Sequence, residues 1–187
     1  MGRELGWQRA KKSLSQNFLV DPNLQRKIVE ALAPEPADLV LEIGPGSGAL
    51  TGHLAGAVSR LVLIELDDDL AARLVDEYGA RDDVTVVHAD VLETSIDELT
   101  GGAPYKVIGN IPYGITTPLI FHVLDARTRP ERMVLTVQKE VADRLAAEPG
   151  HKAYGALTVG VQSVAAVEKL FRISRDAFRP RPDVDSA

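Results

Sequence analysis

Short runs of apolar residues alternate along the chain with longer segments in which apolar residues recur every three or four positions. The runs predict five buried β-strands, at residues 39–43, 61–65, 84–88, 105–109 and 133–137. The longer segments predict helices over residues 48–57, 68–78, 117–124 and 139–147. Strands that are apolar at nearly every position and separated by helices indicate an α/β fold, with a mostly parallel sheet covered by helices on both faces.

Ligands in such sheets bind beyond the carboxyl ends of the strands, so the residues that follow each strand are the candidates for function. The first strand leads into a glycine-rich turn in which Gly44, Gly46 and Ala49 fit the permissive dinucleotide-binding pattern. Glu65 ends the second strand, 21 positions beyond Gly44, where a carboxylate can accept hydrogen bonds from two ribose hydroxyls. A surface charge is the simpler interpretation of Glu65 taken alone.

The third and fourth strands are followed by further polar groups. Asp90 is placed either to accept a hydrogen bond from an adenine amine or to cap a helix, and the sequence leaves both open. Asn110, Ile111, Pro112 and Tyr113 follow the fourth strand. The Asn110 side-chain oxygen and neighbouring carbonyls can converge on one exocyclic amine, and Tyr113 offers a flat face for a base. A plain Asn-Pro turn beside a buried tyrosine is the alternative.

Composition narrows the functional classes. The 187 residues suit one domain, and 45% hydrophobic with 26% charged residues excludes a disordered or fibrous chain. The absence of cysteine excludes disulfides, thiolate metal sites and a cysteine nucleophile. No apolar run approaches the ~18 residues of a membrane span, and Met1 to Gln16 does not resemble a secretory signal. We therefore expect a cytoplasmic protein without a membrane partner.

Charge is unevenly distributed around a net value of −6. Residues 1–27 hold six basic and two acidic side chains, whereas residues 61–100 hold twelve acidic and two basic ones. Either the molecule has one cationic end, or these are simply a charged tail and a solvated acidic face. A net negative chain binds nucleic acid only through a local basic patch.

Several segments together resemble the ribosomal RNA adenine dimethyltransferases of the KsgA type. The residues that carry the resemblance are Glu-Ile-Gly-Pro-Gly-Ser-Gly at 42–48, Asn-Ile-Pro-Tyr at 110–113, and the segments at 15–19, 137–142, 154–159 and 177–186. Residues 15–19 read Ser-Gln-Asn-Phe-Leu, with Ser15 at the position where the family usually has glycine. The related macrolide-resistance methyltransferases share part of this set, and segments 137–142 and 154–159 favour the KsgA branch.

The resemblance implies a Rossmann-like class I methyltransferase that transfers methyl groups from S-adenosylmethionine to adenine N6 in ribosomal RNA. Its substrate would be two adjacent adenines near the 3′ end of small-subunit RNA, in the RNA itself or in a pre-ribosomal particle. We expect the protein to be a monomer. No metal is needed, because the sulfonium already activates the methyl group, and His53, His88, His122 and His151 lack ligand spacing. The implied site residues are, for the cofactor, Asn17, Leu19, Gly44, Gly46, Glu65, Asp90, Val91 and Asn110; for catalysis and base stacking, Asn110, Ile111, Tyr113 and Phe178; and for RNA phosphates, Arg9, Lys11 and Lys12. A core aromatic is the alternative role of Phe178.

The resemblance also sets expectations for domain organisation. Residues 1–187 correspond to the catalytic domain, with a basic N-terminal segment and first cofactor motif at 1–20. The family continues past Ser186 into a last strand and a small helical domain, which are absent here, and a strand near residues 167–173 is expected beside that last strand. We expect weaker docking of RNA without the helical domain.

Two other functions remain possible from the sequence. An NAD-dependent oxidoreductase would use the glycine turn and Glu65, but it explains neither residues 110–113 nor residues 16–19. An RNA-binding or assembly module with a vestigial pocket would need no catalysis. Titration with each cofactor distinguishes the oxidoreductase from a methyltransferase, and a methyl-transfer assay distinguishes the non-catalytic module from a methyltransferase.

Overall fold

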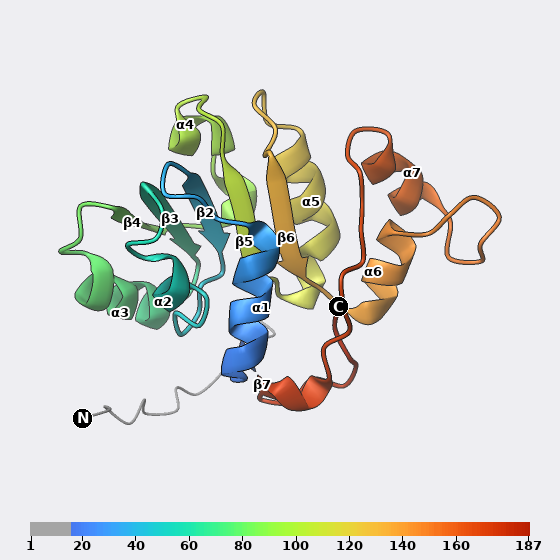
Figure 1. Cartoon of the computed structure of the whole chain (residues 1–187), viewed down its shortest axis with the longest axis horizontal. Coiled ribbons are helices and arrows are strands. Elements are labelled where there is room, and N and C mark those ends of the chain that lie inside the picture. Colours follow the sequence, from blue (N-terminus) through green and yellow to red (C-terminus); the bar gives the residue numbers. More distant parts are fainter. Residues whose placement is uncertain (1–15) are drawn as a thin grey trace.

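The computed structural model describes residues 16–187 and contains a five-stranded parallel sheet in the order β4-β3-β2-β5-β6 (Figure 1). The strands are β2 (Leu39–Ile43), β3 (Arg60–Glu65), β4 (Val84–His88), β5 (Lys106–Asn110) and β6 (Arg132–Thr136). The strand order runs outward in one direction from β2 and in the other from β5. The carboxyl ends of β2 and β5 therefore meet at the switch point, where open α/β sheets bind ligands.

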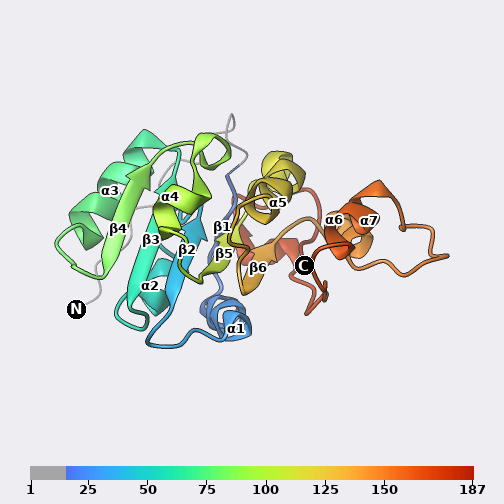
Figure 2. The same cartoon turned by 90° about the horizontal axis from the view of Figure 1, so that it is seen from above.

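Helices cover both faces of the sheet, as predicted. Residues of α1 (Pro22–Leu32), α2 (Thr51–Leu54) and α3 (Asp68–Tyr78) share one buried apolar cluster with alternate strand positions. The other face packs against η2 (Val91–Glu93), α4 (Ile96–Thr100) and α5 (Thr116–Leu124). Figure 2 shows α1 and α5 on opposite sides of the sheet. The sheet is thus buried on both faces, which explains its nearly continuous apolar strands.

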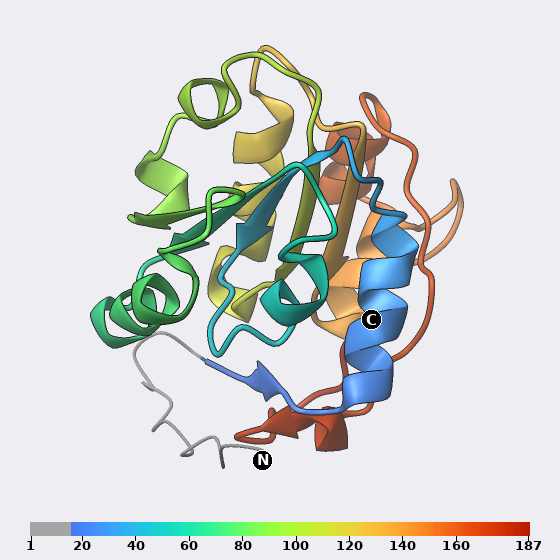
Figure 3. The ribbon, with the colours of Figure 1, turned by 60° about the vertical axis from the view of Figure 1, so that its left-hand side comes forward.

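A separate two-stranded ribbon joins the two ends of the described chain. Its strands are β1 (Phe18–Leu19) and β7 (Phe178–Arg179), which pair antiparallel directly after the short helix η4 (Arg175–Ala177). Figure 3 shows the two segments side by side below the sheet. This pairing brings the N-terminal motif and the residues near 178 to the same side of the molecule.

The remaining helices, α6 (Lys139–Leu145) and α7 (Ala156–Gln162), pack with α5 in a third apolar cluster beyond β6. The sequence predicted neither α1 nor α4 nor α7. It also predicted a helix over residues 48–57 that is shortened to α2, because Gly48 and Gly56 adopt φ values of +81° and +82°. Residues with positive φ do not continue a right-handed helix.

The prediction of a strand near residues 167–173 is wrong. Within it only Ile173 is fully buried, and this residue forms an isolated antiparallel bridge to Ser186. Val167 and Phe171 are partly buried against two different apolar clusters, and the residues between them are exposed, so the segment packs against the core without a continuous ladder of backbone hydrogen bonds. Beside β6, Ser186 also bridges to Gln138, and Val137 and Ala187 exchange two backbone hydrogen bonds of 3.0 Å. The last residues of the described chain are therefore held against the end of β6.

No helix between residues 16 and 187 is both long and apolar enough to cross a membrane.

Candidate active site

A cavity of about 240 Å³ opens at the carboxyl ends of β2, β3 and β5, beneath residues 16–19. Every residue that the sequence assigned to the cofactor or to catalysis lines it, except Phe178: Asn17, Leu19, Gly44, Gly46, Glu65, Asp90, Val91, Asn110, Ile111 and Tyr113. Residues from both sides of the switch point therefore face the same space.

The turn after β2 depends on glycine at two positions. Gly44 and Gly46 have φ values of +63° and +58°, in the left-handed region that other residues rarely adopt. A Cβ on Gly46 would also lie 3.1 Å from Cε1 of Phe18. The bare backbone allows residues 18 and 46 to approach closely at the edge of the cavity.

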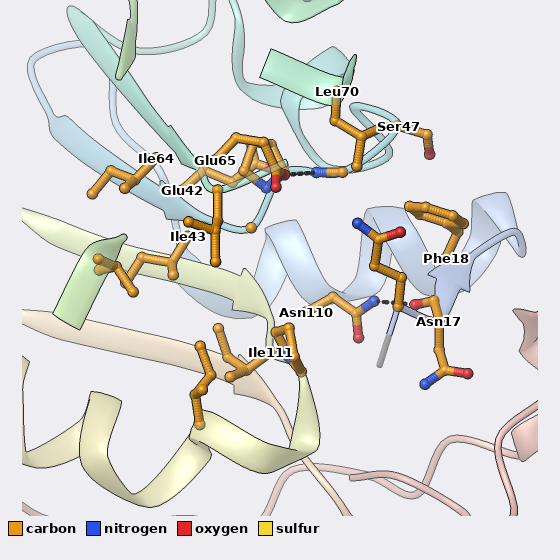
Figure 4. Close-up of a pocket in the computed structure, with 18 of the residues that line it drawn as sticks. Asn17, Phe18, Glu42, Ile43, Ser47, Ile64, Glu65, Leu70, Asn110 and Ile111 are labelled. Carbon is orange, nitrogen blue, oxygen red and sulfur yellow. Dashed lines mark hydrogen bonds between the residues drawn. The ribbon is translucent and has the colours of Figure 1, made fainter. Parts of the chain in front are cut away.

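Glu65 is a fixed carboxylate rather than a surface charge. Its side chain is 6% exposed, and one oxygen accepts a hydrogen bond of 3.0 Å from the N–H of Gly46 (Figure 4). The other oxygen accepts a hydrogen bond of 2.9 Å from the N–H of Asp67. Burial raises the pKa of Glu65, and the backbone N–H groups of Asp67, Gly46 and Leu66 oppose that shift. The two oxygens of a carboxylate together accept about four hydrogen bonds, so the group retains acceptor capacity for a ligand.

Asp90 caps a helix and lines the cavity at the same time. Its Oδ1 accepts a hydrogen bond of 2.9 Å from the N–H of Leu92, at the start of η2. The capping role left open by the sequence is therefore present. Contact with an adenine amine stays a prediction, and it would have to use the other carboxylate oxygen or a second lone pair of Oδ1.

Asn110 is oriented by the N-terminal segment. Its Nδ2 donates a hydrogen bond of 2.8 Å to the backbone carbonyl of Asn17 (Figure 4). Since a carbonyl only accepts, this contact uses the donor end of the amide and leaves Oδ1 for a ligand that donates. Nearby, Nε2 of Gln16 donates to Oδ2 of Asp67 (3.1 Å), which ties the same segment to the end of β3.

Tyr113 begins a short 3₁₀ turn, η3 (Tyr113–Ile115), which lines the cavity after β5. Its ring is half-buried, and its hydroxyl lies 2.8 Å from Oγ of Ser186. Burial raises the pKa of the Tyr113 hydroxyl, and the Ser186 contact lowers it. This position is compatible with both interpretations of Tyr113, as a stacking surface for a base and as a buried tyrosine beside an Asn-Pro turn. The ring is partly buried, and it also lines the cavity.

Phe178 is not in the cavity, which corrects its expected placement. Its side chain is 1% exposed and belongs to the core cluster beneath β1, because the β1–β7 pairing turns it inward beside Leu19. In this arrangement the ring presents no face to a base, and its position matches the core-aromatic interpretation. Arg9, Lys11 and Lys12 lie outside the described residues, so their expected RNA contacts stay predictions.

Glu42 is a candidate that the sequence interpretation missed. It lines the cavity from β2, is 1% exposed, and accepts a hydrogen bond of 2.8 Å from the hydroxyl of Thr51. Burial raises the pKa of Glu42 from its ordinary 4.5 to about 7. A lone acid inside an otherwise apolar strand was the available signal.

Leu66 is a second cavity residue that the sequence interpretation missed. It follows Glu65, lines the cavity, and has a side chain that is 48% exposed. An exposed leucine beside a buried carboxylate provides an apolar wall next to a polar anchor, which suits a flat heterocycle attached to a sugar.

Among residues 16–187, no group of three His, Asp or Glu side chains could together hold a metal ion.

Comparison with known proteins identifies similar sequences over nearly the whole chain. The profile of the family described as "Ribosomal RNA adenine dimethylase" matches residues 7–187. The chain is 46% identical over 182 residues to "Ribosomal RNA small subunit methyltransferase A" of Enterococcus faecalis, covering 95% of this chain and 62% of that protein. The protein of the same name from Moorella thermoacetica is 44% identical over 185 residues, covering 94% and 64%. The chain thus spans less than two thirds of these relatives' lengths.

Two solved structures are similar in fold as well as sequence. A dimethyladenosine transferase from Plasmodium falciparum superposes with a TM-score of 0.81 at 32% identity, covering 90% of this chain and 60% of that one. The 23S rRNA methyltransferase ErmE superposes with a TM-score of 0.80, also at 32% identity, covering 91% and 67%.

Proposed function

The chain belongs to the ribosomal RNA adenine dimethylase family and has the fold of the class I methyltransferases, and we propose that it transfers methyl groups from S-adenosylmethionine to N6 of adenines in ribosomal RNA. The observation that carries this proposal is the orientation of Asn110. Its amide nitrogen is occupied by the Asn17 carbonyl, so its acceptor oxygen is left beside the same cavity that Glu65 and the glycine turn line. An acceptor in that place suits an exocyclic amine.

The cavity fits S-adenosylmethionine on its own chemistry. Glu65 has acceptor capacity for the ribose hydroxyls, and Gly44 and Gly46 leave bare backbone for the amino-acid end of the cofactor. Leu66 supplies an apolar wall for the adenine ring, beside Asp90 for its amine. We assign Asn17, Leu19 and Val91 to the same pocket on their position and on the family resemblance.

Bound S-adenosylmethionine supplies a methyl group on positively charged sulfur, which makes the methyl carbon electrophilic. An exocyclic amine is a poor nucleophile, because its lone pair is delocalised into the purine ring. By accepting a hydrogen bond from that amine, Asn110 Oδ1 favours a pyramidal nitrogen whose lone pair points at the methyl carbon, with the Ile111 carbonyl as a second acceptor. The N–C bond forms as the C–S bond breaks, and the amine loses a proton to solvent. The residues act chiefly by positioning.

The target adenine has to leave its stack to reach this cavity. We assign Tyr113 as the surface on which the extruded base stacks, since its ring stands at the cavity and offers a flat face. The remaining parts of the proposal rest on the relatives' names and the resemblance. They are a small-subunit ribosomal RNA substrate with two adjacent adenines, phosphate contacts through Arg9, Lys11 and Lys12, a monomeric catalytic domain over residues 1–187, and action in the cytoplasm.

The proposal is tested by adding labelled S-adenosylmethionine and small ribosomal subunits to the purified chain, with separate calorimetric titration of S-adenosylmethionine and NAD. We expect binding of S-adenosylmethionine but not NAD, and label in RNA recovered as N6-methylated adenine. Glu65→Ala should bind the cofactor more weakly and serves as the matched control for the cofactor site. Tight binding of NAD would favour the oxidoreductase alternative. Cofactor binding with no label in RNA would favour a non-catalytic RNA-binding module.

A further inference from the structure

Ser186 contacts the candidate site from a distant part of the chain. It is fully buried, with 0% of its surface exposed, and its hydroxyl lies 2.8 Å from that of Tyr113, 73 positions earlier. A buried serine hydroxyl that reaches a cavity-lining tyrosine is a specific arrangement, because each group would otherwise need another partner or water.

The backbone around Ser186 is held from two sides. Its N–H donates to the carbonyl of Ile173 (3.0 Å), and its carbonyl accepts from the N–H of Ile173 (2.9 Å). The next residue, Ala187, exchanges two further hydrogen bonds of 3.0 Å with Val137 at the end of β6. The backbone of Ser186 is consequently fixed relative to the sheet, and its buried hydroxyl extends from that anchored position.

Tyr113 stands at the start of a short turn. It begins the single 3₁₀ turn η3, in which the N–H of Ile115 donates to the carbonyl of Pro112 (3.1 Å). The hydroxyl oxygen lies on the axis of the Cβ–Cγ bond, so a contact to it sets the direction in which the side chain points, and with it the place of the ring. The contact with Ser186 does this from outside the turn.

We propose that Ser186 is a positioning residue that holds the ring of Tyr113 at the place where it can receive the extruded adenine. This inference rests on the proposed function, and it adds a contribution from the last described residues to the recognition of the base. It places the effect of Ser186 on the base and not on the cofactor, because the hydroxyl contact joins Ser186 to Tyr113 and not to Glu65, Asp90 or the glycine turn.

The inference is tested first without turnover. Protein labelled with ¹³C at the tyrosine Cζ gives a resonance for Tyr113, identified by its loss in Tyr113→Phe. We expect Ser186→Ala to shift this resonance, and titration with adenosine 5′-monophosphate in the presence of S-adenosylhomocysteine to show roughly three- to tenfold weaker binding, the span of one net hydrogen bond. An unshifted resonance or unchanged nucleotide affinity would overturn the inference.

Kinetics supply the second test. In Ser186→Ala and in Tyr113→Phe, kcat/KM for small ribosomal subunits should fall about three- to tenfold while the Kd for S-adenosylmethionine stays within twofold. The double variant should be no worse than either single variant, because both remove the same hydrogen bond. Independent, multiplying losses would count against positioning through Tyr113. Tyr113→Phe removes the bond without altering the buried serine, so the test survives if Ser186→Ala folds poorly.

Thr158→Val is the matched control. Thr158 is also a fully buried hydroxyl residue with hydrogen-bond partners, but it lies on α7 and does not line the cavity. Thr158→Val should lose about as much stability as Ser186→Ala, but its nucleotide affinity and Tyr113 resonance should stay unchanged. If both quantities changed as much in Thr158→Val as in Ser186→Ala, the role of Ser186 would be merely structural. A parent chain that transfers no methyl group would refute the proposed function, while the resonance and nucleotide titration would still decide the role of Ser186.

Discussion

The two halves of the cavity are built in different ways. In the β2–β3 half, which comprises the glycine turn, Glu42 and Glu65, the hydrogen bonds that fix the site join residues 2, 9 and 19 positions apart. In the β5 half, which comprises Asn110 to Tyr113, they join residues 93 and 73 positions apart. One half is assembled by neighbours in sequence, and the other by the two ends of the described chain.

This difference has a physical consequence. Closing a loop of many residues costs more conformational entropy than closing a short one, so the β5 half depends on the rest of the fold being formed. The β2–β3 half needs only two adjacent parallel strands and the turn between β2 and α2. We therefore expect substitutions in the β5 half to impair chemistry most, and substitutions in the β2–β3 half to alter cofactor binding and stability.

The largest expected effect is on turnover in the β5 half. Asn110→Ala removes the acceptor for the target amine, and kcat for methyl transfer should fall on the order of 10²–10³-fold, as for other preorganised hydrogen-bonding groups. The Kd for S-adenosylmethionine should change far less. Asn23→Ala, the same replacement on the exposed surface of α1, is the control. A loss confined to cofactor binding would erase the distinction between the two halves.

The next effect is on stability in the β2–β3 half and depends on pH. Since burial raises the pKa of Glu42 from 4.5 to about 7, the folded protein holds a proton there that the unfolded chain releases. The stabilising effect of that proton is fully present below about pH 4.5 and is lost as pH rises through about 7. Relative to the free energy of unfolding of Glu42→Gln, that of the wild type should decline between pH 4.5 and about 7 by at most about 3 kcal/mol.

Denaturant unfolding of both proteins at pH 4.5, 6 and 8 measures this decline. Parallel curves for wild type and Glu42→Gln would show that Glu42 titrates normally in the folded state, in conflict with its burial.

Cofactor affinity provides the third contrast. Glu65→Ala removes the carboxyl acceptor, and S-adenosylmethionine binding should weaken by about 1.5–3 kcal/mol, the range for hydrogen bonds to charged groups. Part of this loss comes from the turn, because Gly46 also loses its partner. Glu65→Gln keeps one acceptor oxygen and should lie between wild type and alanine in calorimetric titration. Full affinity in Glu65→Ala would remove Glu65 from the ribose site.

The smallest effect separates two glycines of the same turn. Gly44→Ala and Gly46→Ala both place a side chain at positive φ, each at a cost of about 1–2 kcal/mol. Only the second also approaches Phe18, whereas the Cβ at position 44 meets no atom within 4 Å. Gly46→Ala should therefore unfold more readily by up to about 1 kcal/mol, because the ring has to shift. Equal stabilities would mean that Phe18 moves aside freely.

Much of the fold followed from local patterns. The five strands lie within one residue of their predicted positions, and the helix over residues 68–78 has the predicted bounds. Apolar runs and helical periodicity carry this information because a sheet buried on both faces requires them. The helix over residues 22–32 was missed although Asp21 caps it and Pro22 begins it, since the polar residues of its exposed face interrupt the apolar ones.

The sequence by itself determined the glycine turn and Glu65 of the β2–β3 half, although Glu42 was missed. Glycines followed by an acid at the end of the next strand imply a turn and a nearby carboxylate, because adjacent parallel strands end at the same edge. Only the tertiary structure decided the β5 half. The Asn17 carbonyl that orients Asn110, the Ser186 hydroxyl that holds Tyr113, and the burial of Phe178 beside Leu19 all depend on chain ends meeting across the fold. No local pattern encodes such contacts, because their geometry exists only after the sheet has brought distant residues together.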